Sequence, residues 1–292
     1  MTEERAMEIL SENIGELTER SRRAEAQRQI CLRELIDRLL RSGEASDAEG
    51  LYRRFRAALP DADRTDRAML CAEMARDART AAGLLRRSRS AGAEETAAGA
   101  HGKVAMIRTR YNEEAFSVFS EAITGAKRSY VSSFAEACEE VYDNRCEFCV
   151  LPLENETDGR LFGFYAMLDR YELRVCAACT LESEERGERV LYALAGRNLP
   201  DRIPKDVPWG LEFSLTAEHG GGAEDVLRVA TLFDAVLSKL DSLPVGYGDG
   251  MQCFYYRFRM SPSMAAAMEL FLVCEYAEYN CIGICPYMGK NR

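Results

Sequence analysis

Glu154 and Asn155 follow directly after a continuous apolar run at residues 148–153. Such a run is typical of a strand buried on both faces of an α/β sheet. Ligands of these sheets bind beyond the carboxyl ends of the strands. A carboxylate and an amide at this place can orient a polar ligand or move a proton. A turn capped by the Asn side chain is an alternative interpretation of the same residues.

Two Cys-x-x-Cys pairs, Cys146/Cys149 and Cys176/Cys179, have the spacing of a four-thiolate zinc site. Each pair lies at or within a predicted strand, where residues three apart point to opposite faces. We therefore expect these thiols to pack as small hydrophobic side chains, and we expect no metal and no other cofactor. The 11 cysteines, without a secretory signal, favour a reducing compartment.

The first 90 residues have the pattern of helices. A 4-3 spacing of apolar residues predicts one long amphipathic helix that ends at Ser42-Gly43. Asp47 is the expected N-cap of a second helix through residue 59, and a third helix is expected at 63–87. The apolar faces of these helices must pack on one another or on a second subunit. The stripe of the first helix consists of Leu10, Ile14, Leu17, Ala24, Cys31 and Leu35.

From residue 103 the pattern changes to strands that alternate with helices, which predicts a parallel or mixed α/β sheet. Strands are expected at 103–107, 148–153, 173–180 and 189–195, and helices at 113–124, 133–144 and 161–169. The segments at 211–218, 223–237, 240–245, 251–260, 263–275 and 280–286 have the order βαββαβ of a ferredoxin-like unit. The predicted fold class is a multidomain α+β protein, with a helical domain at 1–90, a linker at 91–102, an α/β lobe at 103–200 and a ferredoxin-like domain at 208–288.

The 292 residues carry 48 acidic and 38 basic side chains, a formal charge of −10. This balance argues against a nucleic-acid partner, which would select a basic surface. No apolar run reaches the length of a membrane span, and the charged N-terminus does not resemble a secretory signal. The composition therefore predicts a cytoplasmic protein without a membrane partner.

Residues 149–159 (CVLPLENETDG) resemble the VPIENSxxG segment of prephenate dehydratases. The segments at 134–142 and 165–175 are similar to elements on either side of it in that family. Residues 240–244 (LDSLP) and 283–287 (GICPY) resemble the LESRP segment and the last strand of the ACT domain that follows. The order and spacing agree from about residue 103 to 287. The resemblance implies a role in phenylalanine biosynthesis, where prephenate becomes phenylpyruvate.

The resemblance also implies which residues form the dehydratase site. Glu154 and Asn155 match the family, and the family's Thr-Arg-Phe triplet corresponds to Glu188, Arg189 and Val190. The triplet keeps its Arg, while Glu stands in place of Thr. Only residues 182–187 stand where the family has a second α/β lobe, so one wall of the substrate cleft is expected to be missing. These departures predict dehydratase activity that is weak or lost.

Two alternative functions follow from the flanking regions. Helical domains that precede such dehydratases resemble chorismate mutase, for which Arg28, Arg38 and Asp47 are the candidate residues. Pairing of Arg28 with Glu25 or another helix is the structural alternative for that residue. An ACT domain implies a sensor or regulatory partner that binds phenylalanine between paired domains, and hence a homodimer or higher oligomer. Its candidate ligand-binding residues are Gly222, Ala223, Asp241, Ser242, Leu243 and Pro244.

Overall fold

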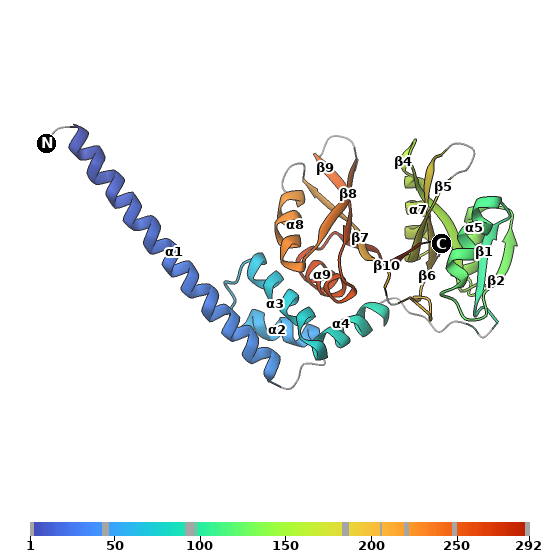
Figure 1. Cartoon of the computed structure of the whole chain (residues 1–292), viewed down its shortest axis with the longest axis horizontal. Helices are drawn as coiled ribbons and strands as arrows, with labels where there is room; N and C mark the ends of the chain where they lie inside the picture. Colours follow the sequence, from blue (N-terminus) through green and yellow to red (C-terminus); the bar gives the residue numbers. More distant parts are fainter. Residues whose placement is uncertain are drawn as a thin grey trace.

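A 39-residue helix, α1 (Glu3–Arg41), extends away from the rest of the molecule (Figure 1). The computed structural model describes residues 3–42, 47–90, 97, 99–182, 187–204, 206–218, 222–246 and 250–289. The predicted end of α1 at Ser42-Gly43 therefore lies at the border of the described residues. Among these residues, no helix is both long and apolar enough to cross a membrane.

Three shorter helices follow α1: α2 (Ala48–Ala58), α3 (Arg64–Arg76) and α4 (Ala78–Ser90). The prediction of one helix over 63–87 is wrong, because the chain is extended at Asp77 (φ −78°, ψ 119°). The side chain of Asp77 accepts hydrogen bonds from the backbone N (3.0 Å) and Oγ1 (2.8 Å) of Thr80. These side-chain hydrogen bonds compete with the backbone hydrogen bonds of a continuous helix, so α3 ends before Asp77 and α4 begins after it.

The N-terminal helices do not form a core of their own. Helices α3 and α4 pack on α9 (Pro262–Glu275), far along the chain. One hydrophobic cluster contains Leu32 and Ile36 of α1 together with Phe213 and Phe271 of the C-terminal part. The helical region and the C-terminal unit are therefore stabilised by the same buried surface.

The second part of the chain, residues 103–196, forms a lobe with a mixed sheet, as the alternating pattern predicted. Strand β1 runs parallel to β2 and β3, whereas β3, β6 and β5 are antiparallel neighbours. Helix α5 covers one face, and α6 and α7 cover the other. Its elements are β1 (Lys103–Ile107), α5 (Arg110–Ser120), β2 (Lys127–Val131), α6 (Phe134–Tyr142), β3 (Phe148–Asn155), β4 (Gly159–Arg160), α7 (Phe162–Arg170), β5 (Arg174–Glu182) and β6 (Arg189–Gly196).

The C-terminal unit, residues 209–288, has four antiparallel strands in the order β10-β7-β9-β8. Helices α8 and α9 cover one face of them. The helix expected at 223–237 ends at Ala230, and Asp234 adopts a left-handed conformation (φ 52°) before β8. The remaining elements are β7 (Trp209–Glu218), α8 (Gly222–Ala230), the 3₁₀ turn η1 (Thr231–Phe233), β8 (Val236–Pro244), β9 (Met251–Arg259) and β10 (Tyr279–Met288).

Strand β10 also pairs in parallel with β5, so one ten-stranded sheet runs through both units. Gly283 lies where β10 crosses β5, beside an irregularity in the β10–β7 register. A Cβ atom at Gly283 would collide with the carbonyl oxygen of Val175 and lie 2.9 Å from its Cβ. Backbone atoms cannot move aside as a flexible side chain would. The approach of the two units therefore requires glycine at this position.

We expect Gly283→Ala to lower the free energy of unfolding by roughly 1–3 kcal/mol, measured by urea denaturation. Gly163→Ala in α7 is the matched control, because nothing lies within 4 Å of its added methyl group. That control should be neutral or slightly stabilising, since Ala favours a helix over Gly. Equal midpoints for Gly283→Ala and the unmodified protein would show that β10 and β5 do not meet in this way.

Candidate functional site

A cavity of about 270 Å³ lies where the lobe meets the C-terminal unit. We call it the interface cavity. Three of the residues singled out from sequence motifs, Glu154, Asn155 and Arg189, line it together. The lining consists of Glu154, Asn155, Glu156, Thr180, Arg189 and Leu191 from the lobe, and Ser238, Lys239, Arg257, Arg259 and Tyr287 from the C-terminal unit.

Glu154, near the end of β3, is held by two cations of the C-terminal unit. Its Oε1 lies 2.7 Å from Nζ of Lys239, and Nη1 of Arg257 donates a 2.7 Å hydrogen bond to its Oε2. Burial alone would raise the pKa of Glu154. The hydrogen bond from Lys239 and the charge of Arg257 outweigh burial and hold this pKa below its ordinary value. Glu154 is therefore a carboxylate at neutral pH and has no proton to donate.

Arg257 connects Glu154 to a second, fully buried carboxylate. Its Nε donates to Oε2 of Glu212 (3.1 Å), and its Nη2 donates to Oε1 of Glu212 and to Oη of Tyr165 (both 3.2 Å). The Tyr165 hydroxyl in turn donates to Oε1 of Glu212 at 2.8 Å. Burial raises the pKa of Tyr165 well above its ordinary value, so this hydroxyl keeps its proton.

Arg160 completes the arrangement from β4, with a fully buried side chain. Its Nη1 pairs with Glu212, and its Nε donates to Oδ2 of Asp241 at 2.8 Å. Its guanidinium lies over the rings of Tyr165 and Tyr255, 4.8 and 5.4 Å from their centroids. Burial would raise the pKa of Glu212, but the charges of Arg257 and Arg160 keep this pKa below its ordinary value.

These groups form what we call the interface ion network, which joins the lobe to the C-terminal unit. It contains three carboxylates and three cations, so its charges balance and each buried charge has a partner. Its members are Glu154, Arg160 and Tyr165 of the lobe, and Glu212, Lys239, Asp241 and Arg257 of the C-terminal unit.

Two further arginines line the interface cavity outside this network. Arg259, at the end of β9, is exposed and has no ion-pair partner within the part of the chain that the structure describes. Arg189 is also exposed, and its Nε lies 4.0 Å from the nearest carboxylate oxygen, on Glu156. The lining thus holds four cations and two carboxylates. Such a cavity can accept an anion, for which guanidinium groups supply charge-assisted hydrogen bonds.

The motif residues beside Glu154 take part in local turns. Asn155 accepts a hydrogen bond from the backbone N of Asp158, and its Nδ2 donates to Oδ2 of Asp158 at 2.9 Å. Glu188 accepts a 2.8 Å hydrogen bond from Oγ1 of Thr157 and does not belong to the lining of the interface cavity. Asn155 therefore combines a turn with a place in the cavity, whereas Glu188 joins the same turn from outside.

The three candidate mutase residues each have a separate partner. Arg28 donates two hydrogen bonds, of 2.9 and 3.0 Å, to Asp66, a buried residue of α3, and one of 3.1 Å to Glu25. Arg38 is exposed and pairs with Glu34, one turn away on α1. Asp47 precedes α2 with an extended backbone but makes no side-chain cap, and it lies 3.8 Å from Arg53. Within one chain the structure does not bring these three side chains to one place.

The candidate ACT-type ligand residues are also divided. Gly222 and Ala223 open α8, while Asp241 is engaged by Arg160 in the interface ion network. Ser242 and Pro244 lie on β8, at the edge of the sheet. Leu243 lines a second, larger cleft of about 880 Å³ between α7 and the lobe-facing side of the C-terminal sheet. The aromatic side chains of Phe162, Tyr165 and Tyr255 form part of its wall.

All 11 cysteines are free thiols. Cys146 and Cys149 belong to the hydrophobic cluster on one face of the lobe sheet, and Cys176 and Cys179 belong to the cluster on the other. The two Cys-x-x-Cys pairs are therefore separated by the sheet. The expectation that the two thiols of one pair point to opposite faces is wrong, because Cys146 precedes β3 and the β5–β6 register shifts at Cys176.

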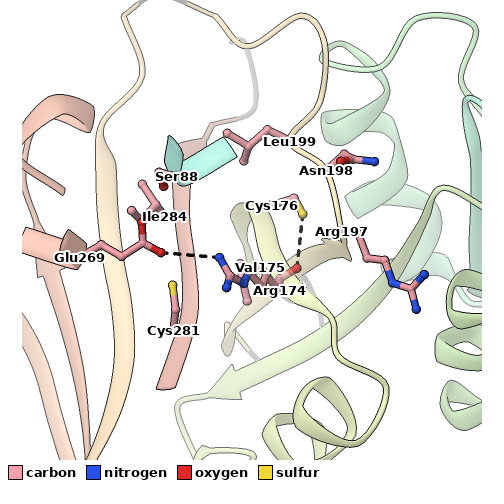
Figure 2. A pocket seen from close by; sticks show the side chains of 10 residues that line it. All are labelled: Ser88, Arg174, Val175, Cys176, Arg197, Asn198, Leu199, Glu269, Cys281 and Ile284. Atoms are coloured by element: carbon pink, nitrogen blue, oxygen red, sulfur yellow. Dashed lines mark hydrogen bonds and ion pairs between the residues drawn. The ribbon is translucent and has the colours of Figure 1, made fainter. Parts of the chain in front are cut away.

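A third, much smaller cavity of about 30 Å³ lies where α4, β5, α9 and β10 meet (Figure 2). Figure 2 shows the side chain of Glu269 directed toward Arg174, with Cys281 beside it. One oxygen of Glu269 lies 3.6 Å from Nη1 of Arg174, and the other lies 3.9 Å from Nη1 of Arg87. This volume suits one or two water molecules. The cavity is therefore a small polar contact between the N-terminal helices, the lobe and the C-terminal unit.

Sequence motifs alone did not identify Thr180, Arg160, Glu212 or Arg257 as site residues. Strands β7 and β9 carry the relevant signal, because their apolar and polar residues alternate. The side chains of Phe213 in β7 and Phe258 in β9 lie in the core beside the helices. The residues directly before them, Glu212 and Arg257, are opposite each other on the other face. A buried Glu–Arg pair on a covered face is a recognisable pattern once the register is known.

No family model and no curated protein matches this chain. Among solved structures, prephenate dehydratase from Streptococcus mutans has a TM-score of 0.52 and 17% identity, over 64% of this chain and 98% of that chain. Prephenate dehydratase from Arthrobacter aurescens, in complex with L-Phe, has a TM-score of 0.49 and 12% identity, over 63% and 89%. GqqA, described as a novel type of quorum quenching acylase, has a TM-score of 0.47 and 17% identity, over 63% and 94%.

The last two similarities fall below a TM-score of 0.5. The first shows likeness of fold, and an identity of 17% shows nothing finer. The mixed α/β arrangement of this chain is thus similar, over about two thirds of its length, to the fold of a prephenate dehydratase.

Proposed function

We propose that this chain is a divergent protein of the prephenate dehydratase family that acts in aromatic amino acid biosynthesis. In this proposal the interface cavity binds a small aromatic or pre-aromatic carboxylate, and dehydratase activity is weak or lost. The observation that carries it is the cation-rich lining around Glu154, contributed by both units. Arg189 and Arg259 supply donors for a ligand carboxylate that the interface ion network does not already use.

Two features of the chain support the loss of turnover. Loss of hydroxide from prephenate requires a proton donor at the departing oxygen. Glu154 has no proton to give, and the hydroxyl groups in the lining are the neutral ones of Thr180, Ser238 and Tyr287. Only six residues stand between β5 and β6, which is too short a connection for a second lobe that would exclude water from the cavity.

We expect the purified full chain to form phenylpyruvate from prephenate no faster than about a hundredth of an ordinary enzymatic rate of roughly 10 s⁻¹. Absorbance of the enol of phenylpyruvate in alkali measures the product, with a protein-free sample at the same neutral pH as the control. Isothermal calorimetry with phenylpyruvate and with prephenate should show saturable heats. Turnover at an ordinary enzymatic rate would contradict the proposed loss of activity. The absence of any heat would contradict the proposal that the cavity binds these carboxylates.

A second candidate function is an ACT-like sensor of an aromatic amino acid in the C-terminal unit. The βαββαβ order and the β10-β7-β9-β8 sheet favour it. Asp241 is already held by Arg160, which argues for a ligand bound elsewhere than at residue 241. The same calorimetric titration with Phe, Tyr and Trp tests this candidate, and no heat with any of them counts against it.

A further inference from the structure

The cleft of about 880 Å³ between α7 and the C-terminal sheet takes no part in the proposed function. We call it the α7 cleft. Its volume is that of a small-molecule site, and such sites often lie where two units of a protein meet. One wall is α7, and the floor includes residues of β7, β9 and β10 that face the lobe. The α7 cleft is therefore a second candidate binding site.

Three aromatic rings form one end of the α7 cleft. Phe162 and Tyr165 come from the start of α7, and Tyr255 comes from β9. The ring centroids of Phe162 and Tyr165 lie 5.2 and 5.9 Å from that of Tyr255 and 6.3 Å from each other. The rings meet edge to face or at a tilt, so each of them holds the others in place. A rigid wall of this kind suits an aromatic group of a ligand.

Carboxylates form the other end of the cleft. Asp169 lies on the same face of α7 as Phe162, about two turns further along, and Glu172 follows the end of the helix. Glu278 precedes β10. All three carboxylates line the cleft, are exposed, and have no ion-pair partner within the part of the chain that the structure describes. They are therefore available to a cationic group of a ligand.

The two arginines of the lining are already engaged. Figure 2 shows Arg174 joined to Glu269, whose oxygen lies 3.6 Å from its Nη1. The guanidinium of Arg197 lies over the ring of Tyr142, 5.2 Å from the centroid. Among the described residues of the lining, the cleft thus offers uncommitted negative charge and no uncommitted cation. The interface cavity, by contrast, offers uncommitted arginines.

Ser214 lies on the floor between the two ends. Its cross-strand neighbours are Asn280 on β10, which donates a 3.4 Å hydrogen bond to Asp169, and Tyr255 on β9. Because Phe213 points to the helix side of the sheet, Ser214 points to the cleft. Ser214 is 7% exposed, and its hydroxyl has no hydrogen-bond partner among the described residues. A buried hydroxyl of this kind is available to a polar group of a ligand.

The spacing of the two ends sets the size of the ligand. Seven residues of helix separate Phe162 from Asp169, which is a rise of about 10 Å. Two strand spacings separate Asn280 from Tyr255, again about 10 Å. An aromatic ring joined by a short alkyl chain to an ammonium group fits between side chains that reach inward from both ends.

We propose that the α7 cleft binds an aromatic amine, with its ring against the aromatic end and its ammonium group at the carboxylate end. A carboxylate on the same ligand is disfavoured, because the charge that the cleft has to offer is negative. The cleft therefore selects an amine over the amino acid that has the same ring. This goes beyond the proposed function, since it concerns another cavity and a ligand of opposite charge.

Calorimetric titration of the full chain with three probes tests the class of ligand. Tyramine carries the ring and the ammonium group, tyrosine adds a carboxylate, and 4-ethylphenol lacks the ammonium group. We expect tyramine to bind about tenfold more tightly than either of the others, and its affinity to fall as salt is added. No saturable heat with tyramine at millimolar concentration, or equal binding of 4-ethylphenol, would overturn the proposal.

Two variants locate the site. Phe162→Ala should weaken tyramine binding about tenfold, because it removes part of the aromatic wall. Asp169→Asn should weaken it about three- to tenfold, because it removes charge but little volume. Glu139→Gln is the control for net charge, since Glu139 is exposed on α6 and does not line the cleft, and it should bind tyramine as the unmodified chain does. Unchanged affinity in both cleft variants would place tyramine elsewhere and overturn the proposal.

Glu172 allows a variant that separates binding from folding. It follows α7 with φ 53°, a left-handed conformation that favours glycine. Glu172→Gly should therefore weaken tyramine binding about threefold or more, while the melting temperature stays the same or rises. Asn144→Gly is the matched control, because Asn144 has a similar conformation (φ 57°) after α6 and lies outside the cleft lining. It should leave the affinity unchanged, whereas unchanged affinity in Glu172→Gly would contradict an ammonium group at this end.

An anionic ligand in the same place would also overturn the proposal. If phenylpyruvate bound more tightly than tyramine and lost affinity in Phe162→Ala, the cleft would have to supply a cation to it. Far-ultraviolet circular dichroism of each variant verifies that the chain stays folded, so that a loss of affinity reports on the cleft.

Discussion

Replacing Arg257 by alanine is expected to lower the free energy of unfolding by about 3–5 kcal/mol. Arg257 is 9% exposed and is the shared partner of Glu154 and Glu212, whose side chains are 24% and 3% exposed. Its removal leaves Glu212 with Arg160 as its one remaining cation and takes one of two cations from Glu154. A buried carboxylate that loses a partner retains its desolvation cost without compensation. Urea denaturation measures the change.

Two control variants separate charge from packing. Arg257→Met retains most of the side-chain volume but none of the hydrogen bonds, so it should be nearly as destabilised as the alanine variant. Arg38→Ala removes an exposed ion pair on α1 and should change the free energy of unfolding by less than about 1 kcal/mol. If Arg257→Met were as stable as the unmodified chain, the interface ion network would contribute packing rather than charge pairing.

Arg257→Ala should also change how the free energy of unfolding depends on pH. Glu154 and Glu212 have pKa values below 4.5 in the folded chain, so unfolding takes up protons as the pH falls. Their contribution is complete above the unfolded pKa near 4.5 and is lost as the pH falls through the folded values. In Arg257→Ala these carboxylates are less well paired, and protonation relieves them. The stability difference between the two proteins should therefore shrink below about pH 4.5, whereas a constant difference would contradict this cause.

Local sequence pattern predicted most of the lobe because its signals lie within single elements. The apolar run before Glu154 predicted β3, and Ser133 predicted the start of α6, where its side chain accepts from the backbone N of Glu136. Strand β2 was not predicted. It is a half-exposed edge strand, and its side chains include Lys127 and Arg128, so no apolar period marks it.

The partners of the site residues could not be read from local pattern. Glu154 was singled out from a motif, yet its charge state is set by Lys239 and Arg257, and Arg257 is 103 residues away in sequence. That contact exists because β10 pairs with β5 and brings the polar face of the C-terminal sheet against the lobe. A short parallel pairing between distant segments leaves no periodic signal in either segment.

The helical stripe illustrates the same limit. Its spacing predicted a long α1, but spacing cannot tell which of its turns the rest of the chain covers. Leu32 and Ile36, each next to a stripe position, are buried against the body, whereas Leu10 and Ile14 of the stripe itself remain exposed. The boundary is set by where α2 and α3 pack against α1, which is a property of the packed structure.

Replacing Arg259 by alanine is expected to weaken binding of phenylpyruvate or prephenate about ten- to a hundredfold, with no change in stability. Arg259 lines the interface cavity and, among the described residues, has no ion-pair partner, so its guanidinium is available to a ligand carboxylate. A hydrogen bond between charged groups contributes about 1.5–3 kcal/mol, which corresponds to this range of affinity. Calorimetric titration of the variant against the unmodified chain measures the ratio of dissociation constants.

The control for this prediction is Arg202→Ala, which removes an exposed arginine that is not part of the cavity lining. It should leave the dissociation constant unchanged, which excludes an effect of net charge alone. The affinity of the unmodified chain should also fall as salt screens the exposed guanidinium groups, and less so in Arg259→Ala. Equal affinities of Arg259→Ala and the unmodified chain would place the ligand elsewhere, with the 880 Å³ cleft beside Tyr255 as the next position to test.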